Sequence, residues 1–188
     1  MLRKITLTGA ACSGKSTIIK ELENRGESVI EESAREIILA RKDMPLTQDE
    51  LLTRQYMVAA KQLINERAYE KINTSGKLFN LFLDRSMIDV AAYCKFLLGY
   101  VPEEIENSVK FAKYSTVFIL ERLPFEKDCA RFENGEEERS KIEELLRETY
   151  ISYNHYPVTV PVMSINERTD FILNYSKKFD FIYCGVTD

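Results

Sequence analysis

The sequence predicts an α/β protein in which a parallel sheet lies between two layers of helices. Short apolar runs alternate with segments of helical spacing over the whole length, and this alternation is typical of strands joined by crossover helices. One stretch, Gly9-Ala10-Ala11-Cys12-Ser13-Gly14-Lys15-Ser16, fits the spacing G-x-x-x-x-G-K-[ST] of a phosphate-binding loop. Several apolar runs end in an acidic residue, which is where parallel α/β sheets bind their ligands. Together these features predict a three-layer P-loop NTPase fold.

Length and composition restrict the class of protein. The 188 residues suit one domain spanning residues 1–188. With 26 basic and 30 acidic residues the net charge is −4, so we expect no nucleic-acid partner. No apolar run approaches the length of about 20 residues that a membrane span needs, and we expect no membrane contact. The four cysteines lack metal-binding spacing and there is one histidine, which argues against a zinc site or a disulfide framework and favours a cytoplasmic protein.

The first strand, loop and helix are predicted to form the phosphate site. Ile5-Thr6-Leu7 is a strand candidate and residues 17–23 have helical spacing, so strand, loop and helix follow in the required order. The loop's glycines let successive N–H groups face a β-phosphate, and the helix presents its positive end to the same anion. We expect Lys15 to supply a mobile charge from a solvated loop and Ser16 a hydroxyl for Mg²⁺. With Thr17 added, residues 9–17 form the predicted ATP-binding set.

The second strand, Ser28-Val29-Ile30, runs directly into Glu31 and Glu32. A helix over 34–40 follows, and the capping box Thr47-Gln48-Asp49-Glu50 predicts a long helix to about Ile72. We assign to core packing the apolar stripe of that helix, which consists of Leu52, Tyr56, Ala59, Ala60, Leu63 and Ile64. Glu32 is a candidate functional acid, although an acid beside a helix start also gains from the helix dipole without any function.

Two buried-strand patterns each end in an acid followed by an arginine, over residues 78–85 and 116–122. The pairs are Asp84-Arg85 and Glu121-Arg122. Phosphoryl transfer needs an acid that orients the metal ion. We favour Asp84 for this role, because Arg85 beside it could bind an anionic acceptor or phosphate. An ordinary ion pair at a strand end is the competing interpretation.

The remaining segments complete the alternation of helices and strands. Helices are predicted from after Ser86 to Gly99, from Pro102, over 136–152 and from Ser164 to about 175, with a last strand at the sheet edge over 158–162. Residues 123–135 are rich in Pro, Asn, Gly and charges, which predicts a lid-like loop that includes part of the acidic stretch 133–138. Arg131 in this segment is our candidate for reaching the transferred phosphoryl group, with Arg122, Lys127 and Arg139 nearby. An ordinary solvated loop is the alternative.

In order, the chain carries G-A-A-C-S-G-K-S-T, V-I-E-E-S-A-R-E-I-I, F-L-D-R-S-M-I-D-V-A-A-Y, the lid-like D-C-A-R-F-E and V-T-V-P-V-M-S-I-N-E-R-T-D-F-I-L. From about residue 3 to 175 this set resembles the NadR-like AAA-domain family of small P-loop proteins, which is related to the kinase domain of the NadR nicotinamide-riboside kinase and more loosely to deoxynucleoside kinases. The resemblance implies a nucleoside-monophosphate-kinase style of P-loop fold with Mg-ATP as donor. It also implies three roles: Asp84 near the metal, Arg85 near the acceptor, and Glu32 as the base for the acceptor's hydroxyl proton. The lid stretch here lacks the glycine expected beside its acid.

The leading hypothesis is therefore a small-molecule kinase that moves the γ-phosphoryl group of ATP to a hydroxyl of a nucleoside-like acceptor. The main alternative is a regulatory ATPase that acts through a protein partner. A switch GTPase is not favoured, because no N-K-x-D motif follows a late strand. A binding module without catalysis fits less well, because Lys15, Ser16 and Asp84 are all present. The acceptor's identity and the oligomeric state do not follow from the sequence.

Overall fold

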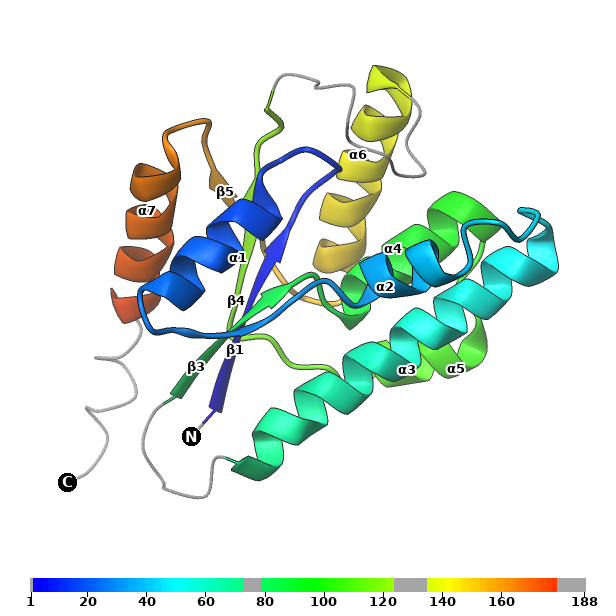
Figure 1. Cartoon of the computed structure of the whole chain (residues 1–188), viewed down its shortest axis with the longest axis horizontal. Helices are drawn as coiled ribbons and strands as arrows, with labels where there is room; N and C mark the ends of the chain where they lie inside the picture. Colours follow the sequence, from blue (N-terminus) through cyan, green and yellow to red (C-terminus); the bar gives the residue numbers. More distant parts are fainter. Residues whose placement is uncertain (1, 73–78, 124–134, 179–188) are drawn as a thin grey trace.

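The structure, a computed structural model, describes residues 2–72, 79–123 and 135–178. Its centre is a parallel sheet of five strands in the order β2-β3-β1-β4-β5 (Figure 1). The strands are β1 (Leu2–Thr8), β2 (Ser28–Ile30), β3 (Phe79–Asp84), β4 (Thr116–Leu120) and β5 (Val158–Val160). All of these strands were predicted from the sequence, and β5 lies at a sheet edge as the neighbouring proline indicated.

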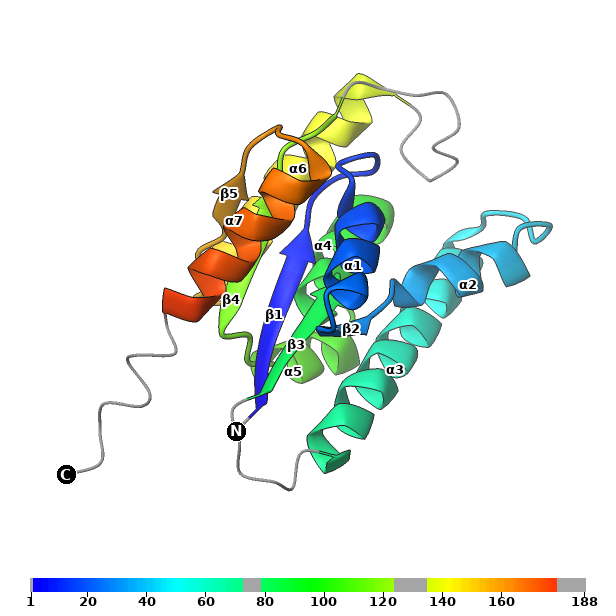
Figure 2. The same cartoon turned by 60° about the vertical axis from the view of Figure 1, so that its left-hand side comes forward.

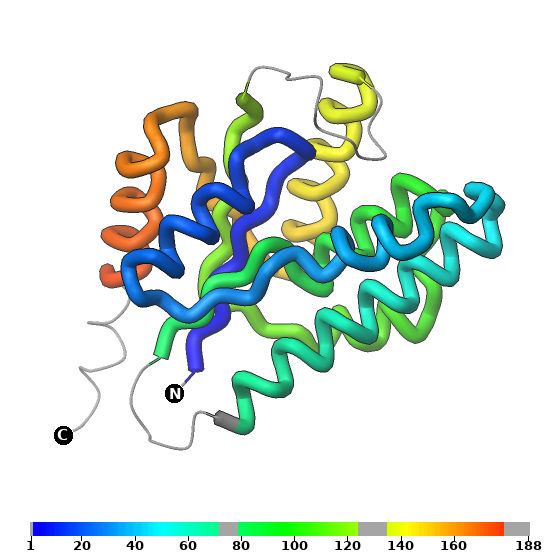
Figure 3. Tube along the Cα trace, viewed as in Figure 1, coloured from blue at the N-terminus to red at the C-terminus, as the bar shows by residue number. Residues whose placement is uncertain are grey.

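The helices of the described residues connect these strands. They are α1 (Lys15–Asn24), α2 (Ser33–Ala40), α3 (Gln48–Ile72), α4 (Met87–Leu98), α5 (Glu103–Lys110), α6 (Glu136–Ser152) and α7 (Ile165–Lys178). Figure 3 shows α2 running alongside the first half of α3, so that the two helices together extend beyond the sheet. No helix in the described part of the chain is long and apolar enough to cross a lipid bilayer.

Helices cover both faces of the sheet, as the sequence predicted (Figure 2). One apolar cluster joins α1 and α7 to one face, and its strand residues include Ile5, Leu7 and Phe82. A second cluster joins α3, α4, α5 and α6 to the opposite face through Leu81 and Leu83. Neighbouring residues of β3 thus point to opposite faces, which is the alternation expected of a strand buried on both sides.

The register of the strands brings their carboxyl ends to one edge of the sheet. Leu7 of β1 lies beside Asp84 of β3, and Ile30 of β2 lies beside Leu83. Directly after β3, a capping box begins α4: Ile88 N donates to Ser86 Oγ at 3.1 Å, and Ser86 N donates to Asp89 Oδ2 at 2.9 Å. The residue between strand and cap, Arg85, is therefore held in a fixed position.

The long helix α3 differs from the sequence prediction in the face that it buries. Tyr56 is 38% exposed and Ile64 is 67% exposed, so the predicted apolar stripe does not pack into the core as a unit. Beside the apolar Val58 and Ala59, the buried face carries polar side chains, namely Glu50, Arg54, Gln55, Gln62 and Glu66. Most of these groups can be buried because facing elements supply partners. Ser33 Oγ, for example, donates to Gln62 Oε1 at 2.7 Å.

One helix start differs in detail from the prediction. At the start of α3, Glu50 N donates to Thr47 Oγ1 at 3.2 Å, but the Glu50 carboxylate binds Arg41 and Arg54 and does not complete a capping box. The helix α6 begins at Glu136 as predicted, so Glu136, Glu137 and Glu138 of the acidic stretch lie in its first turn. Acidic side chains are stabilised there by the positive end of the helix.

The cysteines depart from the prediction at one position. Cys12 is disulfide-bonded, whereas Cys94, the other cysteine in the described part of the chain, is a buried free thiol. Burial raises the pKa of the Cys94 thiol to about 12. Sequence spacing did not reveal the disulfide, because its formation depends on the distance between Cβ atoms in the fold.

Candidate functional site

The phosphate loop connects the end of β1 to the start of α1. Gly9 has a φ of 139° and Gly14 a φ of 85°, both in the region that favours glycine. Gly9 is also crowded, since a Cβ at this position would lie 2.8 Å from Leu120 O of the neighbouring strand β4. Backbone geometry therefore explains both glycines of the motif.

Lys15 is buried in the loop and is not solvated as the sequence suggested. Its side chain is 4% exposed. Its Nζ donates to Gly9 O and Ala10 O at 2.8 Å each, and to Ser13 Oγ at 3.0 Å. The reason is that the loop wraps around the ammonium group and presents oxygen atoms to it. Lys15 thus has two possible tasks, to hold the loop together and to carry charge toward a bound phosphate.

Ser16 and Asp84 form the polar pair at which the sequence placed a metal ion. Ser16 Oγ donates to Asp84 Oδ2 at 2.9 Å. Asp84 is 1% exposed, and its Oδ1 is buried without a hydrogen-bond partner among the described residues. Burial, followed by the nearby charge of Glu32, raises the pKa of Asp84. A buried carboxylate oxygen without a partner, beside a serine hydroxyl, fits Mg²⁺.

The surroundings of Asp84 favour a metal ion that is shared with a nucleotide. No group of three or more His, Cys, Asp or Glu side chains that could hold a metal occurs within residues 2–72, 79–123 and 135–178. Mg²⁺ is commonly bound by one or two protein groups together with substrate phosphates and water. Ser16 and Asp84 would supply the protein's part of such a set.

Replacing Asp84 by asparagine should lower the apparent affinity for Mg²⁺ during turnover. The affinity for nucleotide without metal should change less. The amide retains an oxygen for Ser16 but loses the charge that attracts a hard cation. We expect the Mg²⁺ concentration at half-maximal turnover to rise by about 10-fold or more. Titrating Mg²⁺ at fixed ATP for wild type, Asp84→Asn and Glu121→Gln compares the two strand-end acids. A shift confined to Glu121→Gln would show that the wrong acid was chosen.

Glu32 and Arg85 follow the neighbouring strands β2 and β3, and their side chains meet beyond the strand ends. Arg85 Nε donates to Glu32 Oε1 at 2.8 Å, and both side chains are less than a tenth exposed. Arg85 has a φ of 74°, and its N–H donates to Leu7 O at 3.0 Å. This strained backbone directs the guanidinium group toward Asp89 Oδ1, 3.5 Å from Nη1, and over the ring of Tyr93 at 4.8 Å. Strained conformations of this kind gather at functional sites.

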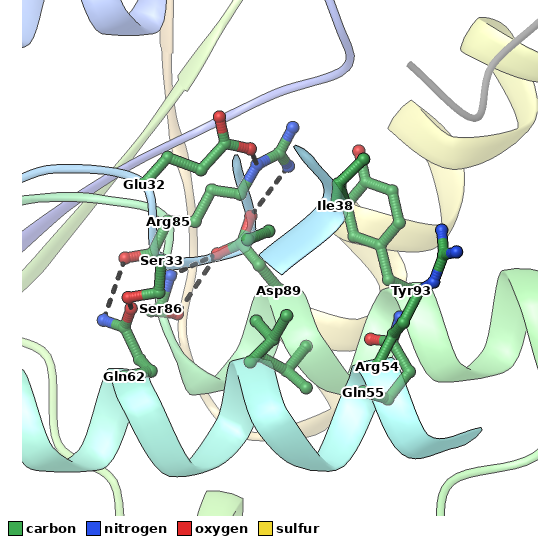
Figure 4. A pocket seen from close by; sticks show the side chains of 13 residues that line it. Glu32, Ser33, Ile38, Arg54, Gln55, Gln62, Arg85, Ser86, Asp89 and Tyr93 are labelled. Carbon is green, nitrogen blue, oxygen red and sulfur yellow. Dashed lines mark hydrogen bonds and ion pairs between the residues drawn. The ribbon is translucent and has the colours of Figure 1, made fainter. Parts of the chain in front are cut away.

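A cavity of about 50 Å³ adjoins the Glu32–Arg85 pair. This space exceeds the 10–15 Å³ or so that one water molecule needs, so it has room for a larger group. Its lining includes Ile38, Gln55, Val58 and Tyr93. Figure 4 shows Glu32 and Arg85 toward one end of the cavity and Gln55 toward the other.

Two glutamines of α3 line this cavity but differ in their hydrogen bonding. Gln62 is fully engaged: its Oε1 accepts from Ser33, and its Nε2 donates to Glu66 Oε1 at 2.9 Å. Gln55 is 5% exposed, and its carboxamide makes no hydrogen bond with any other described residue. Buried amides normally have partners. Gln55 therefore offers a donor and an acceptor to a ligand in the cavity.

The structure brings together most, but not all, of the predicted site residues. Lys15, Ser16, Asp84, Glu32 and Arg85 are linked by the contacts above or by shared cavities. Arg131 and Lys127 lie outside the described residues. Of the other two basic candidates, Arg139 is fully buried and Arg122 binds carboxylates of α6, so neither is a solvated loop residue.

The cavity residues Gln55, Gln62 and Tyr93 were missed by the sequence reasoning. Gln55 and Gln62 belong to a helix whose pattern was interpreted as an apolar stripe, and Tyr93 to a helix assigned only to packing. A usable signal was present in α3, because four polar residues and two apolar ones follow helical spacing and share one face. They are Arg54, Gln55, Val58, Ala59, Gln62 and Glu66. Such a mixed face is typical of a helix that lines a ligand site.

A glycine-rich loop between a strand and a helix, with Ser16 bonded to an acid on the adjacent parallel strand, defines the P-loop class of nucleotide-binding proteins. The chain belongs to a particular family of that class. A family model described as an AAA domain matches residues 4–168, which confirms the resemblance drawn from the motifs. Comparison with curated proteins finds no match.

Solved structures with the same fold include three kinases or kinase-related proteins. Deoxyadenosine kinase from M. mycoides with bound dATP has a TM-score of 0.65 and 18% identity, covering 93% of this chain and 99% of that one. NadR protein in complex with NAD and AMP-PNP has a TM-score of 0.65 and 17% identity, covering 99% of this chain and 50% of that one. Thymidylate kinase from Candida albicans has a TM-score of 0.65 and 16% identity, covering 95% and 92%. At these identities the likeness establishes the nucleoside- and nucleotide-kinase fold.

Proposed function

We propose that this protein is a Mg²⁺-dependent kinase that transfers the γ-phosphoryl group of ATP to a hydroxyl of a nucleoside-like acceptor. The observation that carries the proposal is the position of Glu32. Its side chain lines the cavity that contains Gln55 and Tyr93, and it also lines a second groove of about 580 Å³ with Ser16 and Asp84. A hydroxyl held in the first cavity would therefore lie beside the phosphate and metal site.

The residues around Glu32 can each take one role in phosphoryl transfer. The loop's N–H groups and Lys15 bind the phosphates of ATP, and Ser16 and Asp84 would hold a Mg²⁺ ion that offsets the phosphate charge. Glu32 accepts the proton of the acceptor's hydroxyl, which makes the oxygen a better nucleophile. Arg85 holds the Glu32 carboxylate through the 2.8 Å contact and places positive charge next to the acceptor.

The solved structures support the same class of substrates. Their ligands include dATP in deoxyadenosine kinase, nicotinamide-containing NR and NAD in NadR, and AMP-PNP in NadR. Each combines a ring with a sugar or phosphate. A ring against Tyr93 and Gln55, with a sugar hydroxyl at Glu32, would occupy the cavity in the same general manner.

An ADP-release assay with Mg-ATP tests this proposal. The panel contains nucleosides, deoxynucleosides, nicotinamide riboside and nucleoside monophosphates, each added singly. Stimulation by one class of compound, with a matching phosphorylated product found by mass spectrometry, is the expected result. Slow release that is indifferent to the whole panel would contradict it and favour the regulatory ATPase.

Gln55→Leu should weaken use of the acceptor without changing use of ATP. Leucine fills a similar volume but cannot pair with a polar ring edge, and a buried ligand group left without its partner costs about 1–3 kcal/mol. We expect kcat/KM for the acceptor to fall by about 10-fold or more, with the KM for ATP unchanged. Gln48→Leu makes the same chemical change at an exposed position of α3 and serves as control. Equal kinetics for the two variants would exclude Gln55 from acceptor binding.

A further inference from the structure

Every backbone carbonyl oxygen of the phosphate loop, from Gly9 to Gly14, accepts a hydrogen bond from another group of the protein. Lys15 Nζ and the backbone N–H groups of Leu123 and Ile18 bind four of them, at Gly9, Ala10, Cys12 and Gly14. The other two, Ala11 O and Ser13 O, accept from arginine side chains. Buried backbone carbonyls normally have partners, but two arginines are an unusual means of supplying them.

Arg168 of α7 binds the loop to the ends of two strands. It is 2% exposed, and its Nη1 donates to Ser13 O at 2.7 Å. Its Nη2 donates to Glu121 O at 2.9 Å after β4, and its Nε donates to Pro161 O at 2.8 Å after β5. One planar guanidinium group thus fixes the loop relative to both strands.

Arg139 of α6 makes an equivalent contact with the loop's first half. It is fully buried, and its Nη2 donates to Ala11 O at 3.1 Å and to Leu123 O at 3.2 Å. Arg139 and Arg168 are the two largest fully buried side chains among the described residues. The two helices that carry them follow β4 and β5, so the loop is held from the part of the fold that is remote from the acceptor cavity.

The charge of Arg168 is not neutralised by an ion pair. Within the described residues its guanidinium group donates to three carbonyl oxygens and forms no salt bridge with a carboxylate. Burial lowers the pKa of the Arg168 guanidinium, an effect that the more distant charge of Glu121 opposes. A buried cation without a counter-ion is unfavourable unless another group supplies the opposite charge. A phosphate in the loop is an anion that would do so.

Peptide geometry connects these contacts to the face of the loop that binds phosphate. The C=O and the following N–H of a trans peptide point in opposite directions. Holding Ala11 O and Ser13 O toward the arginines therefore directs the N–H groups of Cys12 and Gly14 to the other side. Cys12 has a φ of 58° and Gly14 a φ of 85°, conformations that need outside support in the case of a non-glycine residue.

We propose that Arg139 and Arg168 are positioning residues, which hold the phosphate loop from behind with the N–H groups of Cys12 and Gly14 directed at the anion. The inference rests on the proposed function, since it assumes that the loop binds a polyphosphate. It adds a requirement that the loop motif alone does not contain, namely two arginines from the last two helices. Their effect is on phosphate binding and does not involve contact with the reacting atoms.

The test is the affinity for two probes, pyrophosphate and Mg-ADP, measured by isothermal titration calorimetry. Arg168→Met removes the three hydrogen bonds and the charge while keeping an unbranched apolar stem. We expect both dissociation constants to rise by about 10-fold or more, equivalent to about 1.4 kcal/mol or more. Arg168→Lys keeps a charge but cannot reach three carbonyls in one plane, so its affinity should lie between those of wild type and Arg168→Met.

Arg25→Met is the matched control. Arg25 also connects α7 to the end of α1, but its side-chain partners Glu21, Asp170 and Asn166 all lie outside the phosphate loop. It should leave both dissociation constants unchanged even if the melting temperature falls. If Arg168→Met does not fold, Arg168→Lys and Arg139→Lys carry the test, and wild-type affinity in both would overturn the inference.

A failure of the proposed function and a failure of the positioning role give different binding results. If wild type binds neither pyrophosphate nor Mg-ADP, the proposed function itself is wrong. If wild type binds both, and Arg168→Met binds them equally well with only a lower melting temperature, Arg168 merely stabilises the fold and the positioning role is wrong.

Discussion

Replacing Lys15 by alanine is expected to lower phosphoryl transfer by about 100-fold or more, the scale seen when a charge contact to a developing anion is lost. In the structure Lys15 Nζ binds Gly9 O, Ala10 O and Ser13 Oγ. These are weak competitors for an ammonium group compared with a polyphosphate, because a charged acceptor gives a stronger hydrogen bond. Lys15 can therefore exchange its loop oxygens for phosphate oxygens when a nucleotide binds.

Burial adds a second expected effect of the same substitution. Removing Lys15 takes the Nζ donor away from Gly9 O and Ala10 O, so we expect a lower melting temperature along with the loss of rate. Thermal unfolding and single-turnover ATP consumption should be measured on the same samples. Lys110→Ala removes an exposed lysine that pairs with Glu106 on α5 and should change neither quantity. Turnover near the wild-type level in Lys15→Ala would mean that the loop is not a working phosphate site.

The elements that the sequence predicted well are those specified by local patterns. Ser28–Ile30 and Thr116–Leu120 are strands with the predicted bounds, and α4 lies between the predicted Ser86 and Gly99. In each case an apolar run or a cap is enclosed by residues that stop the element. The glycines and Lys15 of the loop are also recognisable from spacing alone, because a phosphate-binding turn requires them close together in sequence.

The features that the sequence did not predict depend on contacts between distant segments. Arg168 and Ser13 are 155 positions apart, and Arg139 and Ala11 are 128 positions apart. In the sequence both arginines resemble ordinary charged residues of amphipathic helices. The polar face of α3 was missed for the same reason, since Gln62 Oε1 accepts a hydrogen bond from Ser33 only after α2 and α3 have packed together.

The position of Glu32 shows how the two kinds of information combine. Its place after the second strand was visible in the sequence, and helix-dipole stabilisation was an equally good explanation. In the structure Glu32 precedes α2 but its side chain makes no capping hydrogen bond to that helix. It binds Arg85 instead and lines both cavities. A purely local reason for the acid is therefore weakened, and a role at the junction of two binding sites is favoured.

Glu32→Gln is expected to lower kcat with the acceptor by about 10²- to 10⁴-fold, the usual contribution of a general base. The amide cannot accept a proton at neutral pH, but its oxygen can still accept the hydrogen bond from Arg85 Nε. The KM for ATP should stay close to the wild-type value, because a general base acts on the acceptor's hydroxyl and not on ATP. Slow ATP hydrolysis without acceptor should also persist, since water does not depend on a base placed for the acceptor's hydroxyl.

A structural role for Glu32 makes different predictions, and these decide between the two explanations. Arg85 is buried with its charge, so removing the partner's charge could destabilise the fold by about 3–5 kcal/mol as in other broken buried pairs. Glu31→Gln, at the exposed neighbouring acid, controls for a general change in charge beside β2. A large loss of kcat in a Glu32→Gln protein that melts near the wild-type temperature would support the base. An equal loss of ATP turnover with and without acceptor, accompanied by a lower melting temperature, would show that Glu32 holds Arg85 in place. The reason is that the loss of a general base for the acceptor's hydroxyl would slow the transfer reaction alone.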